Sequence, residues 1–395
     1  MVHLIKMNKI SRIFLILSYL LIVIILIADT PLFLSILDIK DIPIRTLFDT
    51  NDIGVYFQSS GWIIGKGKLY TEVASEYPLA ANFLFGFCRL ISNIFKDVNP
   101  FYAFAIVWSL FGLTAWLYTT KIVNEIVGNN QIIKICWLLP ATIYFSVFRY
   151  DIFPTLFFIL SIWSLKENKL IKSALFLGIT IALKGYALFT IPSFFFFLNY
   201  NFGFKKTIRF ILISILPLII LNFSTFLFLG KDALVAPYEF HLVRKFNGQS
   251  TWDTLNLQFL VRKLPFLPTF LMIITSMLGF LRKPRNISEL AESSLLAITG
   301  FVSSLIFYSP QFCLWILSAA TFIRNKRILF LTCTLCFFSY IYFPITFDMQ
   351  YTHKINLFIY EMVILIVSIL RIFLIFDLIS GIKFNKLKFK NLFYK

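Results

Sequence analysis

The chain is a series of apolar runs, most of them long enough for a membrane helix, separated by polar or basic segments. A helix needs about 20 mostly apolar residues to cross a bilayer, and fewer where other helices shield it. The pattern therefore predicts an all-α polytopic membrane protein. The clearest predicted membrane helices are Ile10–Ala28, Phe101–Thr120, Ile133–Phe148, Ile152–Leu165, Ile208–Leu229, Pro265–Leu281, Leu290–Tyr308, Gln311–Ile323, Ile328–Tyr342 and Ile355–Ile375.

Two further apolar runs are ambiguous. Ser173–Leu198 is interrupted at Lys184–Tyr186, so it is either one long helix or a hairpin of two short helices with its tip at the interruption. Tyr77–Phe95 carries Arg89 and follows a long polar stretch, which favours an interfacial segment at the outer membrane surface. If Ser173–Leu198 is a hairpin and Tyr77–Phe95 is interfacial, the arrangement that we prefer, the chain has about twelve membrane segments and both termini are cytoplasmic.

The distribution of Lys and Arg supports this arrangement. Most of them fall in short loops on one side of the membrane, as the positive-inside rule expects. A crossing by 77–95 would move several basic clusters to the other side. We therefore expect a multi-pass protein of the cell membrane, with residues 1–395 forming a single integral membrane domain.

The predicted outer face carries most of the long polar sequence. It holds an acid-rich first outer loop, residues 29–76, and a second large outer loop, residues 230–263. It also holds the tight turn Arg149–Asp151 and the interruption at Lys184. The inner loops are short and basic, so a functional site is expected at the outer surface.

Composition excludes several classes of protein. Hydrophobic residues make up 59% and charged residues 14%, and the mean hydropathy is +0.82. Soluble domains have about 45–50% apolar and about 25% charged residues. The net charge of +18 comes from clusters between membrane runs, so it indicates orientation signals and no nucleic-acid partner. The five cysteines are odd in number and lie mostly in apolar stretches, which excludes a disulfide framework.

Asp49 and Asp52 are the first candidates for chemistry. If their segment is helical, they share one face at a spacing of three residues. A carboxylate near the membrane surface can act as a general base when burial or a second carboxylate raises its pKa. The alternatives are that both acids are solvated and balance nearby cations, or that they hold a divalent cation. We favour a site without metal or other cofactor.

Charged residues next to apolar runs form the second group of candidates. Arg149, Asp151 and Lys184 border long membrane segments, where charges are costly and usually face a cavity or a partner. They could bind an anionic group such as phosphate, or they could form ion pairs that are only structural. His241 and Arg244, three residues apart in the second outer loop, could bind a phosphate from one helical face. His353 is a weaker candidate of the same kind.

Four stretches, in this order, resemble GT-C-fold glycosyltransferases, above all the polyprenol-phosphate-mannose-dependent mannosyltransferases and more distantly the GPI mannosyltransferases. The first comprises Asp52–Tyr56, Lys68–Tyr70 and Glu76–Asn82. The others are Arg149–Asp151, Gly178–Pro192 with its Lys184–Tyr186 break, and His241–Trp252. The sequence departs from the family at Pro78-Leu79, where a doubled proline is common, and at Tyr186-Ala187, where a Tyr-Pro is common.

The resemblance implies an inverting transferase that moves a sugar, with mannose expected, from a polyprenyl-phosphate donor to a lipid or glycan acceptor. It implies Asp52 as the general base on the acceptor hydroxyl, with Glu76 as second choice. The donor phosphate would be bound by cationic and imidazole side chains, and the substrates by acids, tyrosines and an amide. The phosphate ligands implied are Lys184, Arg149, His241 and Arg244, and the substrate ligands are Asp49, Tyr56, Glu76, Tyr77, Asp151 and Gln249.

Two other classes remain open from the sequence. A flippase for lipid-linked sugars or a secondary transporter would also be polytopic, and such proteins have broken helices and charges near the bilayer midplane. A membrane acyltransferase or polymerase would use a histidine as base. The proposed chemistry distinguishes them, because replacing Asp52 should abolish turnover only in the glycosyltransferase.

Overall fold

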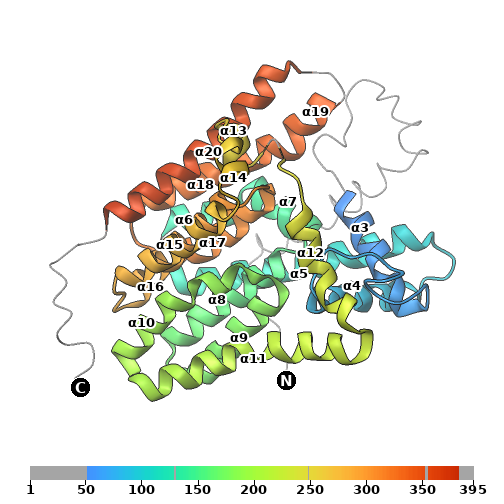
Figure 1. The fold of residues 1–395 in the computed structure, drawn as a ribbon, viewed down its shortest axis with the longest axis horizontal. Helices are drawn as coiled ribbons and strands as arrows, with labels where there is room; N and C mark the ends of the chain where they lie inside the picture. The colour runs from blue at the N-terminus through green and yellow to red at the C-terminus, as the bar shows by residue number, and fades with distance from the viewer. Residues whose placement is uncertain (1–50, 129, 248, 352–354, 382–395) are drawn as a thin grey trace.

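The protein is described by a computed structural model that covers residues 51–128, 130–247, 249–351 and 355–381. These residues form helices and connecting loops without a β-strand (Figure 1). The predicted helix Ile10–Ala28 and the start of the first outer loop lie outside them. The elements are α3 (Asn51–Ser59), η2 (Ser60–Ile64), α4 (Leu79–Ser92), α5 (Pro100–Val127), α6 (Gln131–Leu138), α7 (Pro140–Phe148), α8 (Ile152–Lys166), α9 (Leu170–Leu183), η3 (Gly185–Thr190), α10 (Ile191–Phe202), α11 (Phe204–Leu229), α12 (Lys231–Val243), α13 (Thr251–Thr254), α14 (Gln258–Lys263), α15 (Leu267–Leu281), α16 (Ile287–Ser304), η4 (Pro310–Phe312), α17 (Cys313–Ala320), α18 (Lys326–Tyr340), η5 (Ile341–Thr346), α19 (Phe347–Tyr351) and α20 (Leu357–Ser380).

Four helical segments in the described part of the chain are long and apolar enough to cross a membrane. They are α5, α11, α20 and the segment Lys326–Gln350, which is kinked at Phe343. The pair α6 and α7 is bent by 50° and makes a fifth if it counts as one span. The bend falls at Pro140, which has no N–H to continue the helical hydrogen bonds. The structure thus confirms an all-helical protein with membrane-capable helices, and the number of twelve segments stays a prediction.

The segment 77–95 forms the short helix α4 of 14 residues. At 1.5 Å per residue it is about 21 Å long, less than the roughly 30 Å of a hydrocarbon core. It exposes Phe83 and Phe87 and buries Phe85 and Arg89. Arg89 lies 4.0 Å from the ring of Phe57 and so packs inside the fold. Its length fits the predicted interfacial position, which stays a prediction.

The interruption at Lys184 is present, and two short helices replace one long helix as predicted. Helix α9 ends at Leu183, and the 3₁₀ segment η3 leads into α10. The first residues of α9 and of α11 line one pocket, so the chain between them leaves that end of the molecule and returns to it. Helices α9 and α11 touch where Gly178 faces the Ser214 carbonyl, so closely that an added Cβ would lie 2.7 Å from that oxygen.

The predicted second outer loop, residues 230–263, is largely helical. It contains the helices α12, α13 and α14, and Ser250 caps α13 by accepting a hydrogen bond from the Asp253 N–H. In Figure 1, α12 runs from the end of α11 across the middle of the molecule. This path returns the chain to the elements around Glu76, where its end contributes to the site described below.

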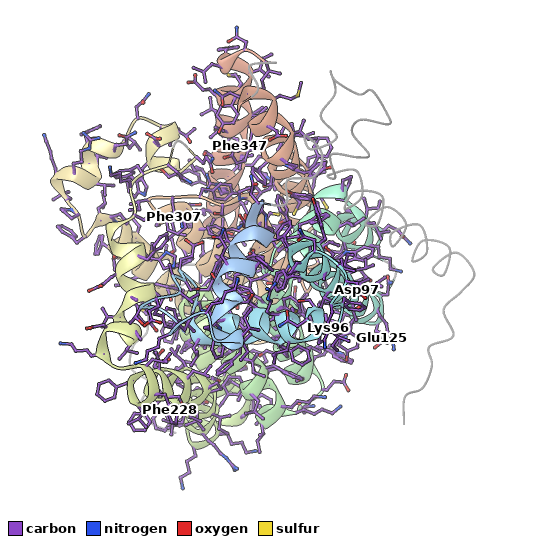
Figure 2. All side chains as sticks on the ribbon, turned by 90° about the vertical axis from the view of Figure 1, so that its right-hand side faces the viewer. Lys96, Asp97, Glu125, Phe228, Phe307 and Phe347 are labelled. Carbon is purple, nitrogen blue, oxygen red and sulfur yellow. The ribbon has the colours of Figure 1, made fainter. Side chains whose placement is uncertain are left out.

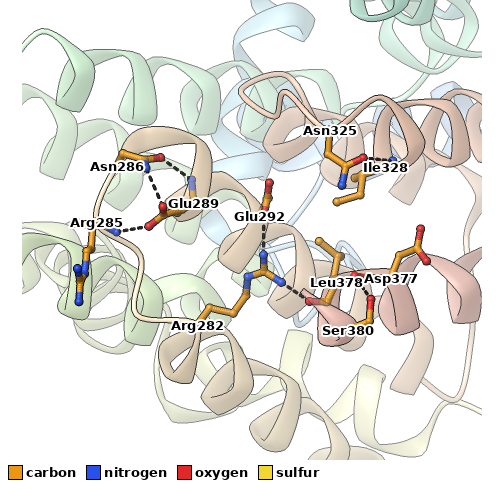
Figure 3. A network of polar contacts seen from close by, with 10 residues as sticks. All are labelled: Arg282, Arg285, Asn286, Glu289, Glu292, Asn325, Ile328, Asp377, Leu378 and Ser380. Atoms are coloured by element: carbon orange, nitrogen blue, oxygen red, sulfur yellow. Dashed lines mark hydrogen bonds and ion pairs between the residues drawn. The ribbon is translucent and has the colours of Figure 1, made fainter. Parts of the chain in front are cut away.

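A polar network joins α15, α16 and α20 near the C-terminal ends of α15 and α20 (Figure 3). The Arg282 guanidinium, just after α15, bonds the Glu292 carboxylate of α16 and the Leu378 carbonyl of α20. Close by, Arg327 pairs with Asp377 at 2.6 Å. These arginines were predicted only as orientation signals, and the structure gives them carboxylate partners as well.

The long helices differ in how far they are enclosed. In its most apolar 18-residue window, α5 is 56% buried and α11 only 17%. Phe228, near the end of α11, is 83% exposed and projects from the edge of the molecule (Figure 2). Helix α5 is therefore central, whereas α11 presents most of its apolar surface outward, where lipid would cover it in a membrane.

Candidate functional site

Three ion pairs join the charged residues singled out in the sequence. Arg149 pairs with Asp52, although their positions are far apart along the chain. The Lys184 ammonium lies 3.5 Å from Oδ1 of Asp151. The third pair links Arg244 Nη1 to Glu76 Oε2 at 3.7 Å. Each pair connects different elements, so the fold gathers these side chains into one region, here called the charged cluster.

Helix α3 brings Asp52 to the charged cluster. Its side chain is 30% exposed, whereas its partner Arg149 is only 3% exposed. One helical turn later, the Tyr56 hydroxyl accepts a hydrogen bond of 3.3 Å from the Tyr150 N–H. Burial raises the pKa of Tyr56, so its hydroxyl stays protonated. Two contacts one turn apart thus fix α3 on the Arg149–Asp151 turn and leave the Asp52 carboxylate partly accessible.

Lys184 lies among four aromatic rings. Its ammonium is 4.4 Å from the ring centroid of Tyr150, 5.2 Å from Trp315, 5.4 Å from Tyr77 and 5.9 Å from Phe312. Ring faces attract cations at such distances. The extended backbone of Lys184 after α9 places the side chain there, and it remains 22% exposed. The aromatic rings and Asp151 therefore fix the position of the Lys184 ammonium, while part of the side chain stays accessible to solvent.

Asp151 is the buried anion beside that cation. Its Oδ1 also accepts a 2.9 Å hydrogen bond from the Trp315 indole N–H. Burial raises the pKa of the Asp151 carboxyl, Lys184 opposes this, and the nearby Asp52 adds to it. Oδ2 has no hydrogen-bond partner among the described residues. Asp151 thus keeps one oxygen that could accept a substrate hydroxyl after a small rearrangement.

The Glu76–Tyr77 segment is held by the residues that follow it. The Asn82 amide donates to the Tyr77 carbonyl at 2.8 Å, and the Tyr70 hydroxyl donates to the same oxygen at 2.8 Å. Ser75 in turn donates to the Asn82 side-chain oxygen at 2.9 Å. These bonds fix the backbone that carries Glu76 and set the Tyr77 ring against Tyr56 and Tyr150.

His241 and Arg244 both contact Phe307. The imidazole stacks on the Phe307 ring with centroids 5.8 Å apart, and the Arg244 guanidinium lies 4.0 Å from the same ring. The sequence had suggested that the two residues share one helical face. Arg244 instead follows the last residue of α12, so they do not. Partial burial, then Lys184 and Arg244, lower the pKa of His241 to about 4. At neutral pH it is a neutral imidazole and would meet a phosphate as a hydrogen-bond donor, not as a cation.

An apolar groove of about 390 Å³ adjoins the charged cluster. It lies between α4, α8, α9 and α11. The groove residue Leu183 directly precedes Lys184, and Phe153 follows Asp151 by two positions. A ligand with a charged head and a long apolar tail would match this combination. The lining residues are Ala80, Phe83, Leu84, Phe87, Phe153, Phe157, Ile179, Ala182, Leu183, Pro217 and Leu221.

The structure does not place Gln249 with the ion pairs of this cluster, and it does not describe two other candidates. Asp49 and His353 lie outside the described residues, so the shared face of Asp49 and Asp52 and the role of His353 stay predictions. The Gln249 side chain accepts a 3.2 Å hydrogen bond from Asn247. Asn247 also bonds both the N–H and the carbonyl of Tyr308, which ties this segment to the loop after α16. Gln249 thereby has a structural contact in this segment.

Sequence reasoning missed the aromatic side chains that hold the cluster. Trp315 stacks on Phe312 at 4.0 Å and on Tyr186 at 4.5 Å, and it bonds Asp151. In a chain with so many aromatic residues, nothing distinguishes these from ordinary core residues. A buried cation was missed too. Arg371, fully buried in α20, lies 3.9 Å from the Tyr308 ring and donates to the Ser368 hydroxyl at 2.9 Å. Its position inside a membrane-capable helix was a usable signal.

No group of three or more potential metal-binding side chains comes together among the described residues. The carboxylates of the charged cluster are instead paired with nitrogen cations. The fold and the cluster define an all-helical protein with membrane-capable helices and a charged site beside an apolar groove. No family model matches the chain, and no curated protein or solved structure matches it either.

Proposed function

We propose that the protein is a GT-C-type inverting glycosyltransferase. It transfers a sugar, with mannose as the expected one, from a polyprenyl-phosphate donor to a lipid or glycan acceptor at the outer face of the cell membrane. The observation that carries the proposal is the meeting of two features. The groove of about 390 Å³ is lined by apolar side chains, and two of its residues, Leu183 and Phe153, are close in the chain to the charged pair Lys184 and Asp151. A polyprenyl phosphate has this distribution of charge and hydrocarbon.

The position along the helices supports an outer site. Asp151 and Lys184 are at one end of α8 and α9, whereas Lys166 and Lys172 are at the other end. Basic residues favour the cytoplasmic side of membrane helices. With Lys166 and Lys172 on the cytoplasmic side, the charged cluster is directed to the outer leaflet, where no nucleotide sugar is supplied.

The chemistry proceeds as a single displacement. The acceptor oxygen forms a bond to the anomeric carbon while the bond from that carbon to the phosphate oxygen breaks, which inverts the configuration. Asp52 takes the proton of the acceptor hydroxyl, and the polyprenyl phosphate leaves with the electron pair. Lys184 and Arg149 stabilise the charge that develops on the phosphate, and an oxocarbenium-like transition state is common in such reactions.

The other predicted ligands have supporting roles. His241 and Arg244, set on Phe307, contact the phosphate by hydrogen bonding and by charge. Glu76, Tyr77, Tyr56 and Asp151 shape the sugar site, and Gln249 and Asp49 stay as predicted substrate ligands. The reaction as written uses no metal or other cofactor.

The test is transfer of radiolabelled mannose from polyprenyl-phosphate-mannose to endogenous acceptors in membranes that contain the protein. Asp52→Asn should lower the turnover by about 100-fold or more, as loss of a general base does. Asp97→Asn is the matched control, because it makes the same chemical change at an exposed residue. Its turnover should equal that of the wild type. Equal turnover of both variants would refute Asp52 as the base.

A secondary transporter or flippase is the second candidate. The observation that favours it is the break after α9 with the Lys184–Asp151 pair beside it, because broken helices and buried charges are typical of transporters. Vesicles that hold the purified protein and a fluorescent polyprenyl-phosphate sugar distinguish the two. Donors that carry mannose, glucose or arabinose are tested in turn. If the intact lipid moves between leaflets and no sugar is transferred from any of them, the flippase hypothesis replaces the transferase hypothesis.

A further inference from the structure

A second pocket lies at the opposite ends of α9 and α11 from the charged cluster. It has a volume of about 410 Å³ and lies between the first turn of α9 and the first three turns of α11. Four of its lining side chains are cations, and the apolar ones lie between them. The lining residues are Asn168, Lys169, Leu170, Ile171, Lys172, Lys206, Arg209, Phe210 and Ile213.

The positive charge of this pocket is compensated by one carboxylate among the described residues. Glu167 lies 3.9 Å from the Lys169 ammonium, and both side chains are largely exposed. An exposed pair of this kind contributes little free energy. By contrast, two other basic loops have close carboxylate partners, since Arg282 pairs with Glu292 and Arg327 with Asp377. Lys172, Lys206 and Arg209 therefore keep a net attraction for an anion.

The backbone adds to this attraction. Helix α9 begins at Leu170, and its N-cap Lys169 makes no side-chain cap, so the N–H groups of its first turn are not bonded by the N-cap side chain. This first turn is itself part of the pocket wall. The N-terminus of a helix carries partial positive charge and favours phosphate. The pocket thus combines four side-chain cations with a helix end.

The surface beyond the pocket is apolar and exposed. Leu175 on α9, and Leu216 and Ile220 on α11, follow the basic residues along the helices and are exposed. Helix α11 as a whole is hardly covered by the rest of the fold. A free phosphate would use only the charged end of this surface, whereas a phospholipid would also use the apolar part for its acyl chains.

We infer that the pocket between α9 and α11 binds the headgroup of an anionic phospholipid, with its phosphate between Lys172, Lys206 and Arg209 and its acyl chains along α9 and α11. Basic pockets between membrane helices are suited to such headgroups. This site is separate from the charged cluster and does not depend on the proposed glycosyl transfer. The lipid is a resident of the membrane and not a substrate.

The test is native mass spectrometry of the full-length protein from detergent, with dioleoylphosphatidylglycerol or dioleoylphosphatidylcholine added. The wild type should retain the anionic lipid in preference to the neutral one. The variant Lys172→Gln/Lys206→Gln/Arg209→Gln should reduce this retention at least about tenfold, because each cation near an anionic lipid strengthens binding severalfold. The control Lys121→Gln/Arg324→Gln/Lys326→Gln removes the same charge at exposed positions and should retain the lipid.

Three outcomes would overturn the inference. Equal retention of the two lipids by the wild type would exclude headgroup recognition, and equal loss in both variants would show a general charge effect. Equilibrium dialysis with labelled inorganic phosphate supplies the third. If the wild type binds phosphate and retains no phosphatidylglycerol, the pocket is a site for a free anion. The unfolding temperature of each variant checks that it is folded. If the triple variant fails to fold, the single variant Lys206→Gln replaces it, and a smaller loss of lipid retention is expected.

Discussion

The Trp315 indole Nε1 lies 2.9 Å from Oδ1 of Asp151, the same oxygen that faces the Lys184 ammonium at 3.5 Å. One carboxylate oxygen therefore orients both a neutral donor and a cation inside an aromatic surround. The Trp315 ring also contributes to that surround, at 5.2 Å from the ammonium. Trp315 thus positions Lys184 twice, by its N–H through Asp151 and by its ring directly.

The first prediction concerns this N–H. Trp315→Phe keeps an aromatic ring and removes the donor, so the buried Asp151 oxygen loses a hydrogen bond. Because the acceptor belongs to a buried carboxyl group paired with Lys184, the free energy of unfolding should fall by about 2 kcal/mol. Thermal unfolding in detergent measures this. Trp62→Phe is the control, since the Trp62 Nε1 is buried without a hydrogen-bond partner among the described residues, and its removal should cost little.

The second prediction separates the structural from the functional role of Lys184. Lys184→Met leaves the Asp151 carboxyl buried without its cation, which should lower the free energy of unfolding by about 3 kcal/mol. Adding Asp151→Asn removes the isolated charge and keeps an acceptor for Trp315. The double variant should regain most of the stability.

Sugar transfer should stay low in both of these variants. The cation stabilises the leaving phosphate, and loss of one such group typically lowers turnover by about 100-fold or more. Two quantities are measured for each variant: the rate of sugar transfer at saturating donor, and the unfolding temperature. If transfer returned together with stability in the double variant, Lys184 would be only a structural residue.

The third prediction is a pH dependence of stability. The pKa of His241 is lowered from 6.5 to about 4 in the folded protein. The unfolded chain therefore binds more protons than the folded one in this range, and stability falls as the pH falls. The contribution of His241 is complete above pH 6.5 and is lost as the pH drops through about 4.

Unfolding temperatures recorded across this range test the prediction. His241→Gln should show a smaller decrease between pH 6.5 and 4 than the wild type, because glutamine does not titrate. His353→Gln removes a different histidine and serves as the control. Identical pH profiles for His241→Gln and the wild type would show that the imidazole titrates normally.

The fourth prediction concerns the close contact of α5 with α7. A Cβ at Gly112 would lie 2.6 Å from the Ser146 carbonyl oxygen and 2.8 Å from that of Val147, and neither backbone atom can move freely. Gly112→Ala should therefore lower the free energy of unfolding by about 1–3 kcal/mol. Gly54→Ala is the matched control, because no atom lies within 4 Å of its Cβ position and alanine favours a helix. Equal stability of the two variants would contradict the packing.

The sequence by itself determined the all-helical fold class and many of the helices. Apolar run length predicted α5, α11, α20 and the segment Lys326–Gln350, because the bilayer sets the length of a spanning helix. The predicted segment Ile152–Leu165 is present as α8, which begins at Ile152 as expected but has only 15 residues, fewer than a span needs. The break at Lys184 was predictable because a charge followed by glycine interrupts an apolar helix. The charged residues of the cluster could also be proposed, since charges beside membrane segments are costly unless they have a partner.

The tertiary structure alone decided which charges pair and what surrounds them. Arg149 pairs with Asp52 and not with the neighbouring Asp151, because the turn before α8 and the helix α3 bring residues distant in sequence together. Trp315 could not be chosen among so many aromatic residues, because its role depends on a contact across 164 positions of the chain. The two pockets also depend on tertiary packing. Their walls come from separate helices, which approach closely at small residues such as Gly178, and local sequence does not specify which helices meet.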